Sequence, residues 1–292
     1  MKNKIQEYKL LDSGNWQKLE QVGEYRLVRP ALNAAWKPSL NQSEWKNVHG
    51  IFTRNATTGK NSGKWQWLNG GTPDSWTCRW GGVNIVIKPT NFGHLGFFAE
   101  QYTNWQWQRE TIQKMLKHNN EVKVLNMFAY SGCGSMAMAQ AGAQVTHLDA
   151  ARGMIEWGKD IQAINDDVPN NIRWITDDVQ KFTAREVRRG SKYNALILDP
   201  PSFGRGANGQ LWKIEQHLDP LLTNLQQLID YNNEFFVILS CHSPGYSPIV
   251  LSRLLQDFFP QGNFITSGEM IIPQYNSENL LPAGIFSRIS TI

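Results

Sequence analysis

Cysteine is scarce in this sequence of 292 residues, and the cysteines that are present form no recognisable pattern. The three are Cys78, Cys133 and Cys241, with no Cys-x-x-Cys pair and no His/Cys cluster at metal-ligand spacing. This pattern argues against a disulfide framework and against a zinc site. We therefore expect neither disulfides nor a bound metal.

Long apolar runs are also absent. No stretch approaches the roughly 18 consecutive apolar residues that a membrane-spanning helix needs. The N-terminal segment Met-Lys-Asn-Lys-Ile-Gln-Glu-Tyr lacks the apolar centre of a signal peptide. We therefore expect a cytoplasmic protein with no membrane partner.

Positive charge is present but unevenly spread. The net charge is +4, and residues 1–60 carry ten Lys and Arg against five Asp and Glu. Nine of the twelve tryptophans precede residue 110, namely Trp16, Trp36, Trp45, Trp65, Trp67, Trp76, Trp80, Trp105 and Trp107. Basic side chains that neutralise phosphate, together with rings that stack on bases, are typical of surfaces that bind single-stranded nucleic acid. The alternative is that these rings fill the core of a small β domain.

The first part of the chain predicts a small β-rich domain over residues 1–98. Short runs at 25–28, 64–68 and 83–88 are separated by clusters of Gly, Pro, Asn and Ser, which is typical of strands and loops. Residues 99–292 form the second predicted domain. A helix at 102–117 opens it and leads into an apolar run at 122.

From residue 122 onward, apolar runs alternate with helical patterns. We predict strands at 122–127, 145–148, 172–176, 195–198, 234–239, 264–271 and 284–290, and helices after the glycine turn at 132–134 and at 152–164, 180–189, 211–231 and 247–259. The helix at 211–231 is expected to break at Pro220. This alternation predicts an α/β fold, with a doubly wound, mostly parallel, Rossmann-like sheet of seven strands, the last two forming an antiparallel hairpin.

The glycine turn after the first of these strands predicts a nucleotide-like ligand. Gly132-Cys-Gly-Ser-Met-Ala fits the G-x-G-x-x-A pattern, and Asp149 follows the second strand. Ligands of open α/β sheets bind at the carboxyl ends of the strands, where Gly132, Gly134 and Asp149 converge. Both a dinucleotide and S-adenosylmethionine carry a ribose that suits Asp149, so this segment leaves both cofactors open.

The segment Asp199-Pro-Pro-Ser-Phe, directly after the fourth strand, separates these alternatives. Two prolines fix two φ angles and remove two N–H donors, so the turn presents a carboxylate and carbonyl oxygens only. Such acceptors suit a base with N–H groups, such as cytosine N4 or guanine N1 and N2, and Phe203 offers a ring for stacking. A dehydrogenase has no use for this surface, and the alternative is a tight turn that merely ends a strand.

A further acid follows the third strand. Asp178 is placed to accept the amine of an adenine, while Asp177 is assigned to solvent or to capping the next helix. Either acid is able to cap that helix. We favour ligand contact for Asp178.

Three motifs in the same order resemble bacterial 23S ribosomal RNA methyltransferases of the class I, S-adenosylmethionine-dependent type. Residues 126–132, Asn-Met-Phe-Ala-Tyr-Ser-Gly, resemble the Asn-x-Phe-x-Tyr-Thr-Gly loop of that family, with Ser131 in place of threonine. Asp199-Pro-Pro-Ser-Phe resembles its Asp-Pro-Pro-x-Phe motif, and Gly96-Phe-Phe-Ala-Glu-Gln resembles a lead-in that helps to close over the cofactor. The N-terminal hundred residues do not resemble the PUA domain or the RNA-binding modules of well-known members.

The resemblance implies S-adenosylmethionine as cofactor and methyl transfer to RNA, ribosomal in type, with the basic and tryptophan-rich N-terminal region as the RNA contact. The cofactor residues implied by these motifs and by the sheet are Phe98, Gln101, Asn126, Phe128, Tyr130, Ser131, Gly132, Gly134, Asp149, Asp178 and Asp199. The family includes cytosine-C5 and guanine-N7 enzymes, so the methylated atom stays open.

Cytosine C5 differs from a base nitrogen in needing a thiolate that adds to the ring. Cys241, in Ser-Cys-His after the fifth strand, resembles the Ser-Cys-Ser context of the family's C5 enzymes, and the alternative is a small apolar residue that ends a strand. We predict Asp199, Pro200, Pro201, Phe203 and Cys241 as catalytic residues. The alternatives to RNA-base methylation at C5 are amino or N7 methylation of guanine, an RNA-binding module with a vestigial cofactor site, and an NAD-dependent dehydrogenase.

Overall fold

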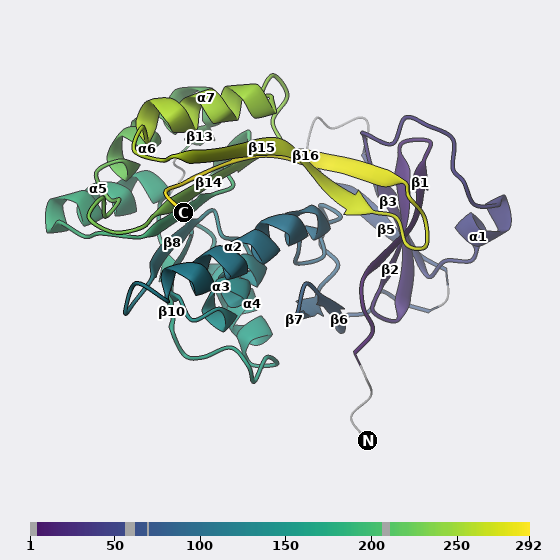
Figure 1. The fold of residues 1–292 in the computed structure, drawn as a ribbon. Coiled ribbons are helices and arrows are strands. Elements are labelled where there is room, and N and C mark those ends of the chain that lie inside the picture. The colour runs from purple at the N-terminus through teal and green to yellow at the C-terminus, as the bar shows by residue number, and fades with distance from the viewer. Residues whose placement is uncertain (1–4, 56–61, 69, 206–210) are drawn as a thin grey trace. The chain divides into compact units, whose positions relative to one another are not determined.

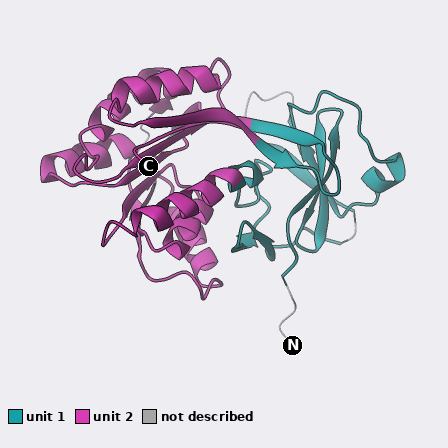
Figure 2. Ribbon diagram, viewed as in Figure 1, with its two compact units in different colours: residues 1–102, 271–283 teal, residues 103–270, 284–292 magenta. Residues whose placement is uncertain are grey.

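A computed structural model describes residues 5–55, 62–68, 70–205 and 211–292 of the chain. The chain divides into two compact units, coloured teal and magenta in Figure 2. Unit 1 is Met1–Tyr102 with Ile271–Ala283, and unit 2 is Thr103–Met270 with Gly284–Ile292. Whereas the sequence predicts one division after residue 98, the late segment 271–283 is grouped with the N-terminal part.

Unit 1 is built from short strands, as its sequence predicts. Its elements are β1 (Lys9–Gly14), β2 (Gln17–Val22), β3 (Tyr25–Pro30), α1 (Gln42–Lys46), β4 (Gly50–Arg54), β5 (Gly63–Trp67), β6 (Trp76–Trp80), β7 (Val83–Ile87) and the 3-10 helix η1 (Ala99–Gln101). The strands β1 to β5 form one sheet in sequence order, and β6 pairs with β7. Leu19, Val28 and Val48 form a small apolar core cluster.

The large sheet lies mostly in unit 2 (Figure 1), and only its residues 271–273 and 280–283 are grouped with unit 1. Its strands are β8 (Lys123–Met127), β9 (Gln144–Asp149), β10 (Ile172–Thr176), β11 (Ala195–Leu198), β14 (Phe236–Cys241), β15 (Phe264–Pro273) and β16 (Leu280–Ser290). They lie in the order β10-β9-β8-β11-β14-β16-β15, in which the first five are parallel and β16 is antiparallel to β14. The predicted seven-stranded, mostly parallel sheet and its closing hairpin are confirmed.

Helices cover both faces of this sheet. They are α2 (Tyr102–Met115), α3 (Cys133–Gln140), α4 (Arg152–Gln162), α5 (Val179–Arg189), α6 (Ile214–Leu225) and α7 (Pro248–Phe258). In Figure 1, α2, α3 and α4 lie on one face, and α5, α6 and α7 lie on the other. The core on the second face joins leucines of α6 and α7 to the central strands β8, β11 and β14. No helix in the described part of the chain combines the length and apolar character that a bilayer span requires.

The prediction for residues 211–231 is wrong in three respects, one of which is that the helix already ends at Leu225. Leu211–Lys213 is the strand β13, which pairs antiparallel with β12 (Phe203–Arg205), so the helix begins only at Ile214. Pro220 lies inside α6 without interrupting it. Proline removes one backbone N–H donor, but packing of the buried leucines of α6 into the core outweighs that loss.

Candidate active site

The predicted site residues follow strands that are neighbours in the large sheet. Met127 pairs with Leu148 of β9 and with Leu198 of β11, and Leu198 pairs with Leu239 of β14. The loops after these four strands therefore start side by side at one edge. Because the strands are parallel, this edge is the carboxyl edge, where α/β sheets bind ligands.

The loop after β8 has an unusual backbone. Phe128 (φ 54°), Tyr130 (φ 53°) and Gly132 (φ 86°) all adopt left-handed conformations. Bulky residues rarely do so, and such strain is typical of ligand-binding loops. Asp149 holds the loop, since its Oδ2 accepts a hydrogen bond from the backbone N–H of Tyr130 at 2.9 Å. Its Oδ1 accepts the N–H of Ala151 at 2.9 Å.

Three buried polar side chains next to this loop form a hydrogen-bonded series. Asn126 Nδ2 donates to Ser135 Oγ at 2.9 Å, and Ser135 Oγ lies 2.9 Å from Nδ1 of His147. Burial lowers the pKa of His147 to about 3, so the ring is neutral. Sequence reasoning missed Ser135 and His147, although a histidine in the middle of an apolar central strand was a usable signal.

The glycines of the loop are fixed by close packing. A Cβ on Gly132 would meet the Trp174 ring at 3.0 Å and His147 at 3.2 Å, and one on Gly134 would meet Trp105 Nε1 at 3.2 Å. Ser131 is buried, with its Oγ 3.8 Å from Cys133 Sγ. Burial raises the pKa of Cys133 to about 12, so this thiol stays protonated.

The turn after β11 is rich in hydrogen-bond acceptors, but some of them are occupied. Asp199 Oδ1 accepts a hydrogen bond from Ser240 Oγ at 2.8 Å and lies 3.7 Å from Nε2 of His242. The carbonyl of Pro201 accepts the indole N–H of Trp212 at 2.7 Å. One of the carbonyl oxygens that the sequence predicted to be free is therefore occupied. Phe203 has 55% of its surface exposed, so its ring is accessible.

Cys241 lies at the end of β14, but within the core. Only 1% of its surface is exposed, and it belongs to the apolar cluster beneath α6 and α7. Burial raises the pKa of its thiol, and the charge of Asp199 raises it further. A catalytic thiolate needs the opposite conditions, namely access and a lowered pKa. Nε2 of the neighbouring residue, His242, lies 3.7 Å from Asp199 Oδ1.

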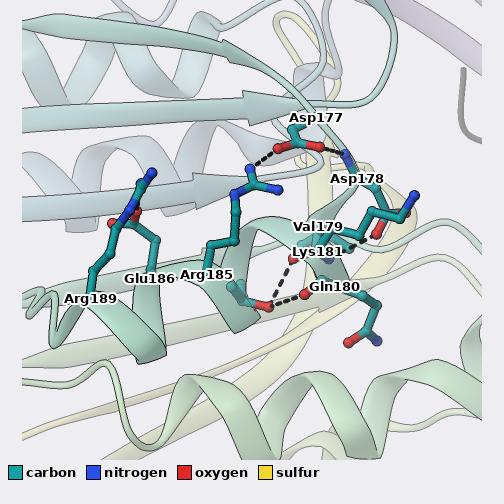
Figure 3. Close-up of polar contacts among 9 residues, drawn as sticks. Asp177, Asp178, Val179, Gln180, Lys181, Arg185, Glu186 and Arg189 are labelled. Atoms are coloured by element: carbon teal, nitrogen blue, oxygen red, sulfur yellow. Dashed lines mark hydrogen bonds and ion pairs between the residues drawn. The ribbon is translucent and has the colours of Figure 1, made fainter.

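The two acids after β10 have different partners in the structure (Figure 3). Asp178 is the N-cap of α5, because its Oδ1 accepts the backbone N–H of Lys181 at 3.0 Å. Asp177 forms an ion pair with Arg185 and accepts the N–H of Asp178 at 2.8 Å. The cap belongs to the residue directly before the helix, which is Asp178. A contact of Asp178 with the cofactor stays a prediction.

Phe98 and Gln101 belong to unit 1. Phe98 is the N-cap of η1, and its carbonyl accepts the N–H of Gln101 at 3.2 Å. Their contact with the cofactor stays a prediction.

The described residues at the carboxyl edge fit a nucleoside-containing cofactor. Each oxygen of Asp149 accepts one backbone N–H and, with two lone pairs, retains capacity for a ribose hydroxyl. The left-handed Gly132 brings backbone to the same edge without a side chain. A glycine turn and an acid after adjacent parallel strands define a nucleotide-cofactor-binding α/β protein.

Comparison with known proteins identifies that cofactor. The family described as S-adenosylmethionine-dependent methyltransferase matches residues 45–241. The chain belongs to this family, and its cofactor is S-adenosylmethionine, as predicted. The dehydrogenase alternative is thereby set aside.

Curated relatives and solved structures agree with this membership. Over 124 residues the chain is 27% identical to ribosomal RNA large subunit methyltransferase I of Aeromonas hydrophila, covering 42% of this chain and 30% of that protein. Over 150 residues it is 28% identical to methyltransferase K/L of Vibrio cholerae, covering 51% of this chain and 20% of that protein. The chain therefore matches less than a third of the length of either relative. A methyltransferase structure from Agrobacterium tumefaciens is 32% identical, with TM-score 0.90, and the match covers 99% of this chain and 92% of that one.

Proposed function

We propose that this protein transfers a methyl group from S-adenosylmethionine to a nitrogen of a base in RNA. The observation that carries the proposal is the turn Asp199-Pro200-Pro201, which directs acceptors to the edge where the cofactor loop also begins. The matched relatives are named as ribosomal RNA methyltransferases, which supports RNA as the substrate class.

Methyl transfer to nitrogen needs positioning more than acid or base strength. S-adenosylmethionine supplies an electrophilic methyl group, and the nitrogen attacks with its own lone pair once it lies in line with the methyl–sulfur bond. In our proposal Asp199 accepts an N–H of the base and sets that alignment. Ser240 holds the carboxylate by donating to Oδ1, and the exposed Phe203 ring stacks on the base.

The state of Cys241 favours nitrogen over cytosine C5 as the methyl acceptor. Carbon methylation needs a thiolate that reaches C6 of the base. Cys241 is 1% exposed, and burial raises the pKa of its thiol. A base nitrogen needs no such nucleophile.

The experiment is methyl transfer to RNA from cells that lack this gene, with radiolabelled cofactor and nucleoside analysis of the product. We expect label in an N-methylated nucleoside, and equal label with a Cys241→Ser variant. Label in 5-methylcytidine that disappears in Cys241→Ser would overturn the nitrogen assignment. Cofactor binding without transfer to any RNA would overturn the RNA proposal as a whole.

We further propose that RNA contacts unit 1 at a patch formed by Trp16, Leu32 and Trp36, here called the Trp16 patch. All nine tryptophans before residue 110 are described, and of these only Trp16 (56%) and Trp36 (40%) are exposed. Asn15 and Trp16 form the two-residue turn between β1 and β2, with φ values of 50° and 65°. Glycine usually occupies the second position of such a turn.

The backbone of this turn is fixed while its ring is open to solvent. Trp16 N–H donates to the carbonyl of Ala34 at 2.8 Å, and the Trp16 carbonyl accepts the N–H of Ala31 at 2.8 Å. The indole of Trp36 donates to the carbonyl of Ser13 at 2.9 Å. A rigid, exposed ring that costs backbone strain is suited to stacking on an unpaired base.

Replacing Trp16 with glycine tests this contact without harming the turn. Trp16→Gly relieves the left-handed strain, so we expect equal or higher thermal stability together with about tenfold weaker binding of single-stranded RNA, in keeping with the energy of one stacked base. Phe264→Ala, which removes an exposed ring from unit 2, is the matched control. Equal RNA affinity of Trp16→Gly and the parent protein would contradict the contact.

A further inference from the structure

His242 directly follows β14 at the carboxyl edge of the sheet, and the proposed methyl transfer does not yet use it. Its side chain is 37% exposed, whereas Cys241, the residue before it, is buried in the core with α6 and α7. Successive residues along a strand point to opposite faces of a sheet. His242 therefore shares the face of Ser240, two residues earlier, and points away from the side of the thiol.

Ser240 and His242 approach the same oxygen of Asp199. Ser240 Oγ donates to Oδ1 at 2.8 Å, and Nε2 of His242 lies 3.7 Å from that oxygen. A hydrogen bond from nitrogen to oxygen spans about 2.7–3.2 Å, so Nε2 lies just beyond this distance from Oδ1. Contacts between partners in proton transfer are often long in a free enzyme and shorten once substrate is bound.

The imidazole ring is packed against a glycine of β16. A Cβ added to Gly284 would lie 2.8 Å from Nδ1 of His242 and 2.5 Å from Cε of Met270, and Cβ atoms essentially never approach other atoms within 3.0 Å. The ring therefore occupies space that a side chain at position 284 would fill. Its Nδ1 lies on the side of Gly284, and its Nε2 lies on the side of Asp199.

An imidazole beside a carboxylate is suited to carrying a proton away from it. Histidine is the side chain used most often in acid–base catalysis, because imidazole gains and loses a proton near neutral pH. The Asp199 side chain is 24% exposed and that of His242 is 37% exposed, so the ring is the more open of the two to water. A proton on Asp199 thus has a route to solvent through Nε2 of the ring.

Methyl transfer releases a proton at some base nitrogens and not at others. The lone pair of the nitrogen forms the new N–C bond, the S–C bond breaks, and its electron pair stays on sulfur to give S-adenosylhomocysteine. An exocyclic amine and N1 of guanine carry an N–H, which is given up as a proton. N7 of guanine carries no hydrogen and releases none. A carboxylate backed by an imidazole serves only the first kind of nitrogen.

We propose that His242 takes up the proton that the base nitrogen passes to Asp199, and that the methylated nitrogen is an exocyclic amine or N1 of guanine. The proton moves from the nitrogen to the carboxylate of Asp199, then to Nε2 of His242, and from the imidazolium to water. This inference rests on the proposed function, since it assumes a base nitrogen as the methyl acceptor, and it excludes N7 of guanine.

The test is the single-turnover rate of methyl transfer to RNA at saturating cofactor, for the parent protein and for His242→Ala. We expect the rate to fall about tenfold, less than the roughly 100-fold of direct acid–base catalysis, because Asp199 remains as the first acceptor. Free imidazole should raise the rate of His242→Ala about threefold and leave the parent unchanged, since a small base replaces the lost ring. A fall in rate without this rescue would overturn the proposal.

His118→Ala is the matched control. His118 is another exposed histidine beside an acid, with its Nδ1 3.0 Å from Oε1 of Glu234. His118 precedes β8 and Glu234 precedes β14, so this pair lies at the amino edge of the sheet. We expect the parent rate for His118→Ala, with no effect of imidazole.

Gly284→Ala is a second variant, for the case in which His242→Ala does not fold by circular dichroism. Its added methyl group displaces the ring from its place beside Asp199 while the imidazole stays in the protein. The rate should therefore fall as in His242→Ala. Parent rates for both variants would contradict the proposal.

The methylated nucleoside separates this inference from the function on which it rests. We expect the label on an exocyclic amine or on N1 of guanosine. Label in 7-methylguanosine would overturn the inference and leave methylation of a base nitrogen intact. Label in 5-methylcytidine, or no transfer to any RNA by the parent protein, would overturn both.

Discussion

The loop after β8 and the turn after β11 begin at paired residues, Met127 and Leu198, yet they present opposite chemistry. The β8 loop leads into the N-terminus of α3, where the N-cap Gly132 has no side chain and the backbone of the first turn presents N–H groups. The β11 turn contains Asp199 and two prolines that have no N–H. One edge of the sheet therefore holds a donor side and an acceptor side next to each other.

The two segments also reach their shapes by different means. In the β8 loop, surrounding contacts stabilise three left-handed residues, and these contacts include the hydrogen bonds that Asp149 accepts from Tyr130 and Ala151. The shape of the β11 turn is fixed by the rings of Pro200 and Pro201, which restrict φ. The strained backbone of the β8 loop thus presents N–H donors, and the prolines of the β11 turn leave only acceptors. Each side suits a different ligand.

Among the substitutions considered, we expect Asp199→Asn, on the acceptor side, to have the largest effect. This change keeps the shape but replaces one acceptor oxygen with a donor, so we expect methyl transfer to fall by about 100-fold, equivalent to about 2.7 kcal/mol in the barrier. Single-turnover rates at saturating cofactor measure it. Ser202→Ala, in the same turn, should stay near the parent rate. A rate for Asp199→Asn within threefold of the parent would contradict the assigned role.

The donor side depends on the neutral state of His147, which supports the loop through Ser135. Its pKa is lowered from 6.5 to about 3 in the folded protein, so the unfolded chain takes up a proton first as the pH falls. The stability that this group contributes is complete above pH 6.5 and is lost as the pH falls towards 3, by about 1.4 kcal/mol per pH unit. Between pH 6.5 and 5 the expected loss is thus about 2 kcal/mol.

Urea unfolding of the parent protein and of His147→Asn at pH 7.5, 6.5 and 5 isolates this contribution. The difference between the two free energies of unfolding should shrink as the pH falls. A difference that stays constant with pH would show that His147 is not buried as a neutral ring.

The smallest expected effect concerns the residue that touches both segments. Trp212 donates to the Pro201 carbonyl at 2.7 Å, and its ring packs edge-on against Phe128 with centroids 4.8 Å apart. Trp212→Phe keeps a ring but loses the hydrogen bond, which we expect to cost about 1 kcal/mol of stability.

Because the turn loses one of its supports, the KM for RNA should rise a few-fold in Trp212→Phe while the Kd of the cofactor stays constant. Steady-state kinetics with varied RNA, together with titration calorimetry, separate the two. A rise in the cofactor Kd alone would place the role of Trp212 on the donor side.

Much of the fold could be predicted because the central strands are buried on both faces. The runs at 195–198 and 234–239 are nearly continuous apolar stretches, and they correspond to the strands β11 and β14, in which every residue is buried. Pro220 misled the prediction, since local propensity does not report how strongly the leucines of α6 are held in the core.

The site could be located from sequence but not described in detail. Asp149 ends β9 and Asp199 directly follows β11, which places both at the carboxyl edge. By contrast, the burial of Cys241 depends on packing against distant residues of α6 and α7, and the choice of Asp178 as the cap depends on the residue at which α5 begins.

The late hairpin has a consequence for how the chain can be cut. Unit 2 is interrupted by Ile271–Ala283, so the backbone passes between the units at three places. A fragment beginning at Thr103 would keep that insertion but lose Leu10, whose carbonyl accepts the N–H of Tyr275 at 2.7 Å. A fragment ending at Tyr102 would lack the insertion altogether. Domain exchange with another methyltransferase would therefore have to transplant a split segment, with two junctions in the hairpin as well as one at Tyr102.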